Sequence, residues 1–247
     1  MKTVVVTNNK GGVGKTAISV HLAYYLEEQG KSVLVIDLDA QGNTSQTLTA
    51  FASGVKTSQL FGAKAPKIPA NPGITLIEAD PLVADLEQAP KEQVLSALRR
   101  VLPLIGKDFD YCVIDTPPAT GLRVISALMA AQYAIAPVEL DSYSLAGITQ
   151  LLQTVIAIER QYNPGLVFVG MLANRLNANS ASQKAALDEL LSNYARYMVP
   201  AKIGNRSSIP EALREGVPVW RLRKTAAREA GAEMLEAFKI IGKRIGL

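Results

Sequence analysis

The sequence predicts an α/β fold: a doubly wound, mostly parallel sheet flanked by helices. Along the 247 residues, apolar runs of strand length alternate with segments of helical periodicity. This is the pattern of parallel strands joined by right-handed helical crossovers. The runs are continuously apolar, as expected of strands covered on both faces. The first run leads into a glycine-rich loop and then a helix, the context in which such a loop binds phosphate.

The expected elements follow from these runs in order. The strands are Thr3–Asn8, Ser32–Asp37, Ile74–Glu78, Tyr111–Asp115, Tyr133–Val138, Val167–Leu172 and Tyr197–Ile203. Helices are expected near 16–29, 91–102, 121–131, 145–162, 180–195 and 226–244. The stretch Ala52–Pro72 has scattered Gly, Pro and Lys, and we expect a surface excursion there. We therefore expect one domain over residues 1–247, with its functional loops at the carboxyl ends of the strands.

The loop after the first strand has the composition of a triphosphate site. Its glycines let backbone N–H groups converge on a phosphate without a Cβ clash, and the next helix N-terminus adds positive charge. Lys15 is expected to reach the β- and γ-phosphates, and the Thr16 hydroxyl to take one position on Mg²⁺. The expected nucleotide contacts are Lys10, Gly11, Gly12, Val13, Gly14, Lys15, Thr16 and Ala17.

Two strand ends carry carboxylates that suit the same chemistry. Asp37 and Asp39 lie at the end of the second strand, although an Asp-rich turn capping the next helix through Asn43 or Thr44 would also explain them. Asp115 closes another apolar strand, as in a Walker B arrangement whose carboxylate faces Mg²⁺ directly or through water. These residue types predict Thr16 and Asp115 as metal residues, and Asp37 joins them through the resemblance described below.

The phosphate loop departs from the pattern G-x-x-x-x-G-K-[ST], because Asn9 replaces the first glycine and a second lysine, Lys10, follows it. The form K-G-G-x-G-K-T resembles the deviant Walker A loop of the ParA/MinD superfamily of partition and positioning ATPases, so the expected fold is of the P-loop NTPase type. The resemblance implies binding of ATP or ADP and a homodimer that forms on ATP binding. In that dimer Lys10 would reach the partner's phosphates, a cation supplied in trans. A solvated loop lysine is the alternative.

The resemblance also implies roles for residues on the later strands. The segment Asp37-Leu38-Asp39-Ala40-Gln41 resembles the family's D-x-D-x-Q switch. Asp39 would then orient the attacking water, and Asp37 would support the Mg²⁺ shell through water, so that the catalytic residues are Lys10, Lys15 and Asp39. Asn174 and Arg175 would contact adenine, with a second wall from the segment Val199–Arg206; capping of a turn is the alternative for Asn174.

Positive charge is concentrated near the end of the chain. Residues 199–247 hold ten Lys/Arg against five Asp/Glu, whereas the remaining residues hold sixteen against seventeen. The bias indicates a surface for a polyanion, with a solvated helix face as the alternative. By the resemblance we expect contacts to double-stranded DNA without sequence preference. The candidates are Lys202, Arg206, Arg214, Arg221, Arg223, Lys224 and Arg228.

The resemblance covers the whole chain and fits the short ParA type, because the sequence starts at the first strand. It implies an ATP hydrolase with slow intrinsic turnover, stimulated by a ParB-like or cargo-adaptor protein. The cargo could be a plasmid, a chromosome or a protein complex. The alternative is a MinD-like membrane-positioning ATPase, whose amphipathic tail would have to come from Phe238–Leu247. Membrane binding is the less favoured reading, because that segment fits a packing helix.

Composition excludes several other classes of protein. The single cysteine, Cys112, lies in an apolar strand and forms neither a disulfide framework nor a cysteine metal site. No signal peptide and no long uncharged apolar run are recognised, so we expect a cytoplasmic, nucleoid-associated protein. His21, the only histidine, is expected to have a packing or surface role. Trp220 is expected to anchor the last helix.

Overall fold

The structure is a computed structural model that describes residues 1–69, 71–140 and 144–247, the side chains of 144–146 excepted. Its centre is an eight-stranded sheet in the order β3-β4-β2-β5-β1-β6-β7-β8, and every pair of neighbours is parallel. The strands are β1 (Lys2–Val6), β2 (Val33–Asp37), β3 (Ala52–Lys56), β4 (Ile74–Glu78), β5 (Tyr111–Asp115), β6 (Tyr133–Val138), β7 (Val167–Leu176) and β8 (Met198–Gly204). The predicted fold class is confirmed.

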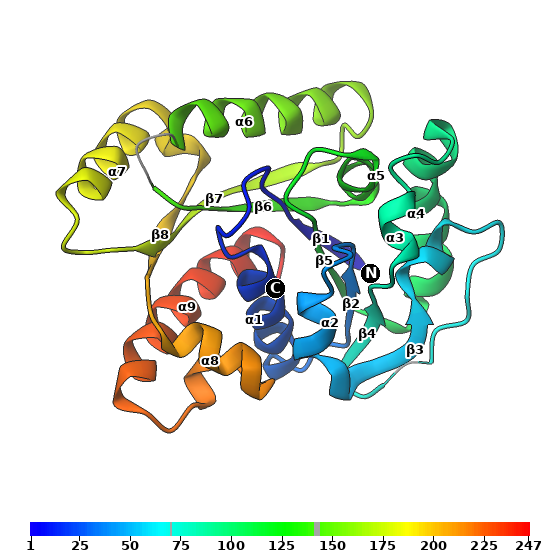
Figure 1. Cartoon of the computed structure of the whole chain (residues 1–247), viewed down its shortest axis with the longest axis horizontal. Coiled ribbons are helices and arrows are strands. Elements are labelled where there is room, and N and C mark those ends of the chain that lie inside the picture. Colours follow the sequence, from blue (N-terminus) through cyan, green and yellow to red (C-terminus); the bar gives the residue numbers. More distant parts are fainter. Residues whose placement is uncertain (70, 141–143) are drawn as a thin grey trace.

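Helices cover both faces of this sheet. They are α1 (Lys15–Glu28), α2 (Asn43–Thr47), α3 (Leu82–Asp85), α4 (Lys91–Ile105), α5 (Leu122–Ala130), α6 (Ser144–Gln161), α7 (Ala181–Tyr194), α8 (Ser208–Glu215) and α9 (Thr225–Arg244). Figure 1 shows α1 and α9 below β6 and β7, and α6 above these two strands. None of the helices among the described residues is long and apolar enough to cross a membrane.

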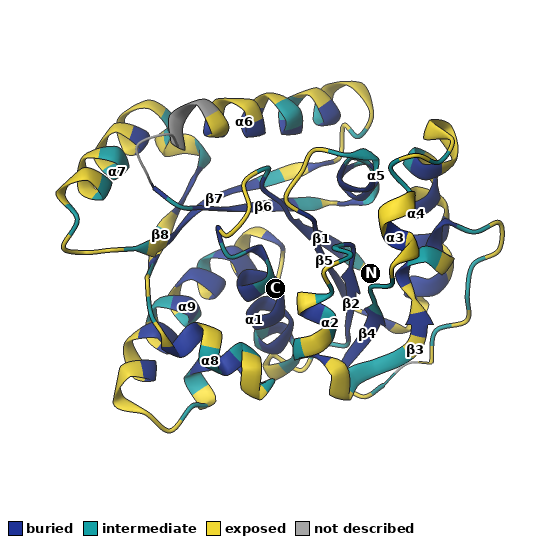
Figure 2. Cartoon of the chain, viewed as in Figure 1, coloured by how far each residue is buried: buried dark blue, intermediate teal, exposed yellow. Residues whose placement is uncertain are grey.

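Each face of the sheet packs its own apolar core. Because successive strand residues point to opposite faces, Val4 and Val6 pack with α1 and α9, whereas Val5 packs with α4, α5 and α6. In Figure 2 the central strands and α1 are buried, while α7 is largely exposed. The continuous apolar runs are thus explained by burial on both sides.

Three local predictions need correction. Residues 52–56 form an edge strand, β3, instead of part of a surface excursion. Of the residues in β3 only Val55 is buried and the pairing with β4 is irregular, so the local sequence carries a weak strand signal. Strand β7 continues to Leu176 and includes Asn174 and Arg175, which were expected to follow it. Helix α2 is preceded by Gly42 without a side-chain cap, so neither Asn43 nor Thr44 is its N-cap.

The three packing predictions are confirmed. Cys112 is fully buried. His21 is also fully buried: its Nε2 accepts the Val219 N–H at 3.1 Å, and its Nδ1 lies 2.7 Å from the Ala17 carbonyl. Trp220 packs edge-on against Phe238 of α9 at 6.3 Å between ring centroids. These contacts fix α1 against the segment that leads into α9.

Candidate functional site

The candidate site lies at the carboxyl ends of β1, β2, β5 and β7. Strand β1 runs into the glycine-rich loop, and α1 begins directly after Gly14, whose backbone is left-handed at φ 94. A Cβ at Gly14 would lie 2.3 Å from Asn174 Nδ2, so the close approach of the two segments also requires glycine. The predicted strand–loop–helix context of the phosphate loop is therefore present.

Two residues at the end of β7 donate hydrogen bonds to the backbone of the phosphate loop. Asn174 is buried, and its Nδ2 donates to the Val13 carbonyl at 2.7 Å. Arg175 Nη1 donates to the Gly12 carbonyl at 2.7 Å, and its Nε lies 3.6 Å from Glu139. Among the described non-glycine residues, Arg175 alone has a left-handed backbone, with φ 57. Such backbones are costly and persist where surrounding contacts impose them. Both residues thus act on the backbone of the loop.

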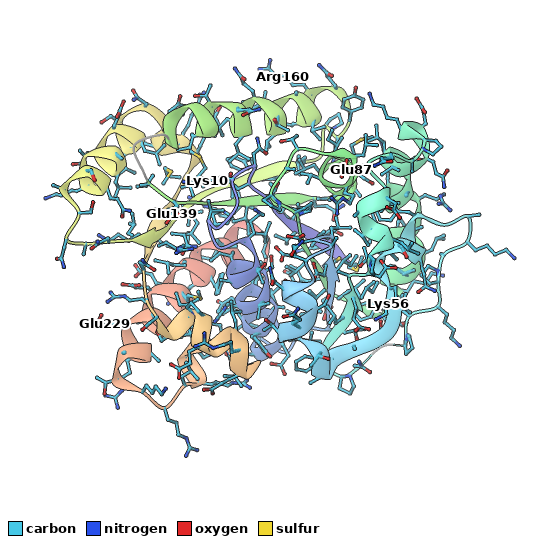
Figure 3. The ribbon with its side chains drawn as sticks, in the orientation of Figure 1. Lys10, Lys56, Glu87, Glu139, Arg160 and Glu229 are labelled. Carbon is cyan, nitrogen blue, oxygen red and sulfur yellow. The ribbon has the colours of Figure 1, made fainter. Side chains whose placement is uncertain are left out.

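The two lysines of the loop have different surroundings. Lys15 is buried, and its ammonium group donates to the Lys10 carbonyl at 3.0 Å. Burial lowers the pKa of Lys15, and the carboxylates of Asp115 and Asp39 oppose that shift. The side chain of Lys10 is exposed on the loop between β1 and α1 (Figure 3). Lys15 is therefore the lysine placed inside the site, and Lys10 the one presented on its surface.

Asp115 is the centre of a hydroxyl cluster. Its Oδ2 accepts hydrogen bonds from Thr16 at 2.8 Å and Thr44 at 2.7 Å, and its Oδ1 accepts one from Ser19 at 3.0 Å. Burial raises the pKa of the Asp115 carboxyl, while the three hydroxyls and Lys15 work in the opposite direction. A cation beside this carboxylate would relieve the cost of its burial.

Asp37 and Asp39 diverge although they are two residues apart. Asp37 is fully buried, and Ser45 donates to its Oδ2 through both the hydroxyl at 2.7 Å and the backbone N–H at 2.8 Å. Burial, followed by the charge of Asp115, raises the pKa of Asp37 to about 7. Asp39 is only partly buried and accepts the Gln41 N–H at 3.1 Å. Asp39 therefore faces the site, whereas Asp37 fastens α2 to the end of β2.

A cavity of about 690 Å³ opens over the loop. Among the described residues, its lining brings the phosphate loop together with the β2, β5, β7 and β8 ends and with α8. The predicted residues in this lining are Gly11, Gly12, Gly14, Lys15, Thr16, Ala17, Asp39, Asn174, Arg175, Arg206 and Arg214. Lys10, Val13, Asp37 and Asp115 are not part of it. The predicted second wall, Gly204 to Arg206, is part of it as well.

Several lining residues were missed from the sequence. Ile209, Pro210 and Leu213 of α8 give the cavity an apolar wall, and Gln46 and Thr47 of α2 also line it. The hydroxyl partners of Asp115 and Asp37, which are Ser19, Thr44 and Ser45, were missed too. Only Ser19 carries a local signal, because it stands one helical turn after Lys15 in the same helix.

The donor set fits Mg²⁺ bound together with phosphate. The described residues contain no group of three His, Cys, Asp or Glu side chains able to hold a metal by themselves. Mg²⁺ is usually held by one or two protein ligands, with phosphate oxygens and waters completing its shell. The Thr16 hydroxyl at the start of α1 lies 2.8 Å from the Asp115 carboxylate at the end of β5, and the two provide such a partial set.

The basic residues predicted for DNA fall into two groups. Arg206 pairs with Glu229 and Glu233, each at 2.7 Å; Arg221 pairs with Glu28 at 2.6 Å; and Lys224 pairs with Glu211. Lys202, Arg214, Arg223 and Arg228 are exposed and form no ion pair with other described residues. The second group leaves its charge available to an external anion.

Comparisons with known proteins show the family of this chain. The AAA domain family matches residues 1–168. Protein IncC of Escherichia coli is 42% identical over 95% of this chain and 67% of its own length. The sporulation initiation inhibitor protein Soj of Bacillus subtilis is 31% identical over 88% of this chain and 90% of its own length. The chain belongs to the ParA/MinD family of partition ATPases.

Solved structures place this ParA-like chain in the same fold. An ATP complex of a McdA variant from Cyanothece covers 97% of this chain and 96% of its own, with a TM-score of 0.82 at 24% identity. Cobyrinic acid a,c-diamide synthase from Mycobacterium smegmatis, with bound ADP and magnesium, covers 87% and 91% with a TM-score of 0.72 at 28% identity. At 24% identity, the McdA structure shows a shared fold. The synthase structure shows that this fold also occurs in an enzyme with bound ADP and magnesium.

Proposed function

We propose that this ParA-like ATPase binds Mg-ATP in the cavity over the phosphate loop, dimerises and then binds DNA without sequence preference. Hydrolysis, slow by itself and stimulated by a ParB-like or cargo-adaptor protein, would reverse the cycle. The observation that supports this most directly is that Lys15, Thr16 and Asp39 line one cavity. The Thr16 hydroxyl in this lining donates a hydrogen bond to Asp115. The protein would work in the cytoplasm on the nucleoid, to segregate or position a plasmid, a chromosome or another cargo.

The residues of the site support phosphoryl transfer to water. Lys15 and the loop N–H groups would hold the phosphates, and the Thr16 hydroxyl and Asp115 carboxylate would hold Mg²⁺. The metal would neutralise charge on the phosphate oxygens. Among the described residues, Asp39 is the carboxylate that lines the cavity, where it can orient a water for in-line attack on the γ-phosphate. Asp37 would act through Ser45, by fixing the loop that carries Asp39.

The exposure of Lys10 supports a role between subunits. Its side chain is outside the lining of its own cavity and is exposed at the loop surface (Figure 3). A cation in that position can serve the phosphates of a second copy facing the same edge of the sheet. Hydrolysis would then depend on dimerisation.

The basic surface supports contact with a phosphate backbone. Arg214 is exposed on α8, Arg228 on α9 and Arg223 on the segment between them. Neutralising backbone phosphates with such residues gives affinity that falls steeply as salt rises. Binding through these contacts needs no reading of base edges.

The membrane-binding alternative is less well supported. Three of the five large apolar residues in the segment that would form a tail, Phe238, Ile241 and Ile245, are fully buried in the core. An interfacial helix needs its apolar face available to lipid. Phe238–Arg244 is instead the end of α9, which packs against β7 and β8.

The first experiment is binding to random-sequence duplex DNA with Mg-ATP, Mg-ADP or no nucleotide, at two salt concentrations. ATP-dependent and salt-sensitive binding supports the proposal, and binding only to anionic liposomes under ATP would replace it with the membrane function. A combined Arg223→Gln and Arg228→Gln variant should weaken DNA binding. A combined Arg99→Gln and Lys107→Gln variant, which removes two charges at the opposite end of the strands, is the matched control.

Two further variants separate binding from hydrolysis. Asp39→Ala should retain ATP and remain on DNA with hydrolysis lost, because the water would have no orienting carboxylate. Lys10→Ala should retain ATP binding but lose DNA binding or stimulated hydrolysis, because the cation in trans is missing. Normal hydrolysis by Asp39→Ala would show that another residue positions the water.

A further inference from the structure

The loop that carries Asp39 is fastened to the neighbouring strand and helix by its backbone. Leu38 precedes Asp39, and its N–H donates to the Asp115 carbonyl at 2.9 Å. The Leu38 carbonyl accepts a hydrogen bond from Arg123 Nη1 at 3.0 Å. Both backbone groups of Leu38 are thus held by the chain segment that contains Asp115 and Arg123. Leu38 itself is fully buried, so this link lies inside the protein.

Arg123 is in turn held in one orientation by Glu87. The Arg123 Nε donates to Glu87 Oε1 at 2.8 Å, and the Leu122 N–H donates to Glu87 Oε2 at 2.7 Å. Glu87, labelled in Figure 3, therefore serves as the acceptor for the first turn of α5 and for the guanidinium together. Burial raises the pKa of Glu87, but the hydrogen bonds and charge of Arg123 and Leu122 outweigh it, so the pKa is lowered overall.

Gly121, which has no Cβ, leaves room for the Glu87 carboxylate. A Cβ at Gly121 would lie 2.4 Å from both Glu87 carboxylate oxygens. The preceding residue, Thr120, donates its hydroxyl to Asn9 Oδ1 at 2.6 Å, which joins the same segment to the phosphate loop. Asn9 is the residue that replaces the first glycine of the general loop pattern. Residues 120–123 therefore contact the phosphate loop at one end and the backbone beside Asp39 at the other.

We propose that Arg123 is a positioning residue for the proposed hydrolysis: it fixes the Leu38 carbonyl and so the loop of residues 38–42 that presents Asp39. Arg123 lies outside the cavity lining and touches no reacting atom. Its buried guanidinium reaches the site only through the Leu38 carbonyl. A link of this kind couples two loops through discrete hydrogen bonds between packed elements. The kinetic consequence rests on the proposed function, whereas the structural consequence does not.

Hydrogen exchange tests the structural part without any nucleotide. In Arg123→Gln, the amides of residues 38–42 should exchange faster, because a buried carbonyl loses its charged donor. The matched control is Arg100→Gln, whose guanidinium likewise donates to backbone carbonyls, those of Gly62 and Ala63, away from the site. Unchanged exchange over 38–42 in Arg123→Gln, or equal acceleration in the control, overturns the inference.

Kinetics test the consequence for the reaction. We expect Arg123→Gln to lower kcat about tenfold, the effect of one lost hydrogen bond to a charged group, with the affinity for Mg-ATP little changed. A parallel loss of ATP affinity would show a merely structural role and overturn the inference. Should Arg123→Gln not fold, Arg123→Lys is the second variant. It keeps the positive charge beside Glu87 but lacks the nitrogen that donates to the Leu38 carbonyl, so the amides of residues 38–42 should again exchange faster. A wild-type protein that binds but never hydrolyses ATP refutes the proposed function and leaves the exchange test intact.

Discussion

Replacing Asn174 with alanine separates two roles for this residue. The family resemblance implies a contact with adenine, whereas the structure uses the Nδ2 group to donate to the Val13 carbonyl of the phosphate loop at 2.7 Å. A residue that holds the loop affects every ligand with a triphosphate. A residue that holds the base affects only ligands with adenine. ATP and inorganic triphosphate, which lacks the base, therefore distinguish the roles.

The size of the effect follows from the burial of the bond. Asn174 is only 3% exposed, so its loss leaves a buried carbonyl without its donor. Such a loss costs about 1–3 kcal/mol, which is roughly 5- to 160-fold in affinity if all of it falls on the bound state. Arg175 still holds the neighbouring Gly12 carbonyl, so we expect a value near the lower end.

The assay is competition of ATP, ADP and inorganic triphosphate against a fluorescent ATP analogue. In Asn174→Ala all three affinities should fall by similar factors. Asn205→Ala is the comparison variant, because Asn205 belongs to the predicted second wall for adenine and should weaken ATP and ADP without affecting triphosphate. If Asn174→Ala weakens ATP and leaves triphosphate binding unchanged, the assignment of Asn174 to the loop is refuted and the adenine contact is supported.

Two further predictions concern the core. Burial, opposed by a hydrogen bond to Ala17, lowers the pKa of His21 to about 4 from the model-compound value of 6.5. The unfolded chain then binds the extra proton first, so the stability that His21 contributes is present above about pH 6.5 and lost as the pH falls towards 4. Denaturant unfolding should show that His21→Gln flattens the pH dependence in this window by up to about 1.4 kcal/mol per pH unit; an unchanged slope would contradict the buried neutral state. The Cys112 thiol is fully buried, and burial raises its pKa, so a thiol reagent at pH 8 should modify it only after unfolding. Modification of the native protein at the rate of a free thiol would show that this core opens.

Much of the fold could be predicted because its signals are local. The bounds of β4, β5 and β6 agree with the predicted strands, since each is a continuous apolar run of strand length. Strand β3 could not be found this way, because Ser53 and Gly54 have low strand propensity and only the pairing with β4 stabilises them there.

The same distinction holds for the site. The phosphate loop was evident from the sequence, since the residues that surround a phosphate are consecutive and their glycines have one physical purpose. The hydroxyls around Asp115 come from positions 16, 19 and 44, and nothing local at Thr44 indicates a partner 71 residues away. The adenine, metal and DNA assignments stay predictions.

The sequence by itself determined the parallel α/β architecture and the phosphate loop with its two lysines. It also determined that Asp37, Asp39 and Asp115 lie at strand ends, because these features depend on residue type and on short spacings. Only the tertiary structure decided how those carboxylates differ. Asp37 and Asp115 are buried among hydroxyl donors, while Asp39 faces the cavity. The tertiary structure also decided that Arg123 donates a hydrogen bond to the Leu38 carbonyl. A hydrogen bond between residues 85 positions apart depends on how the strands and helices pack.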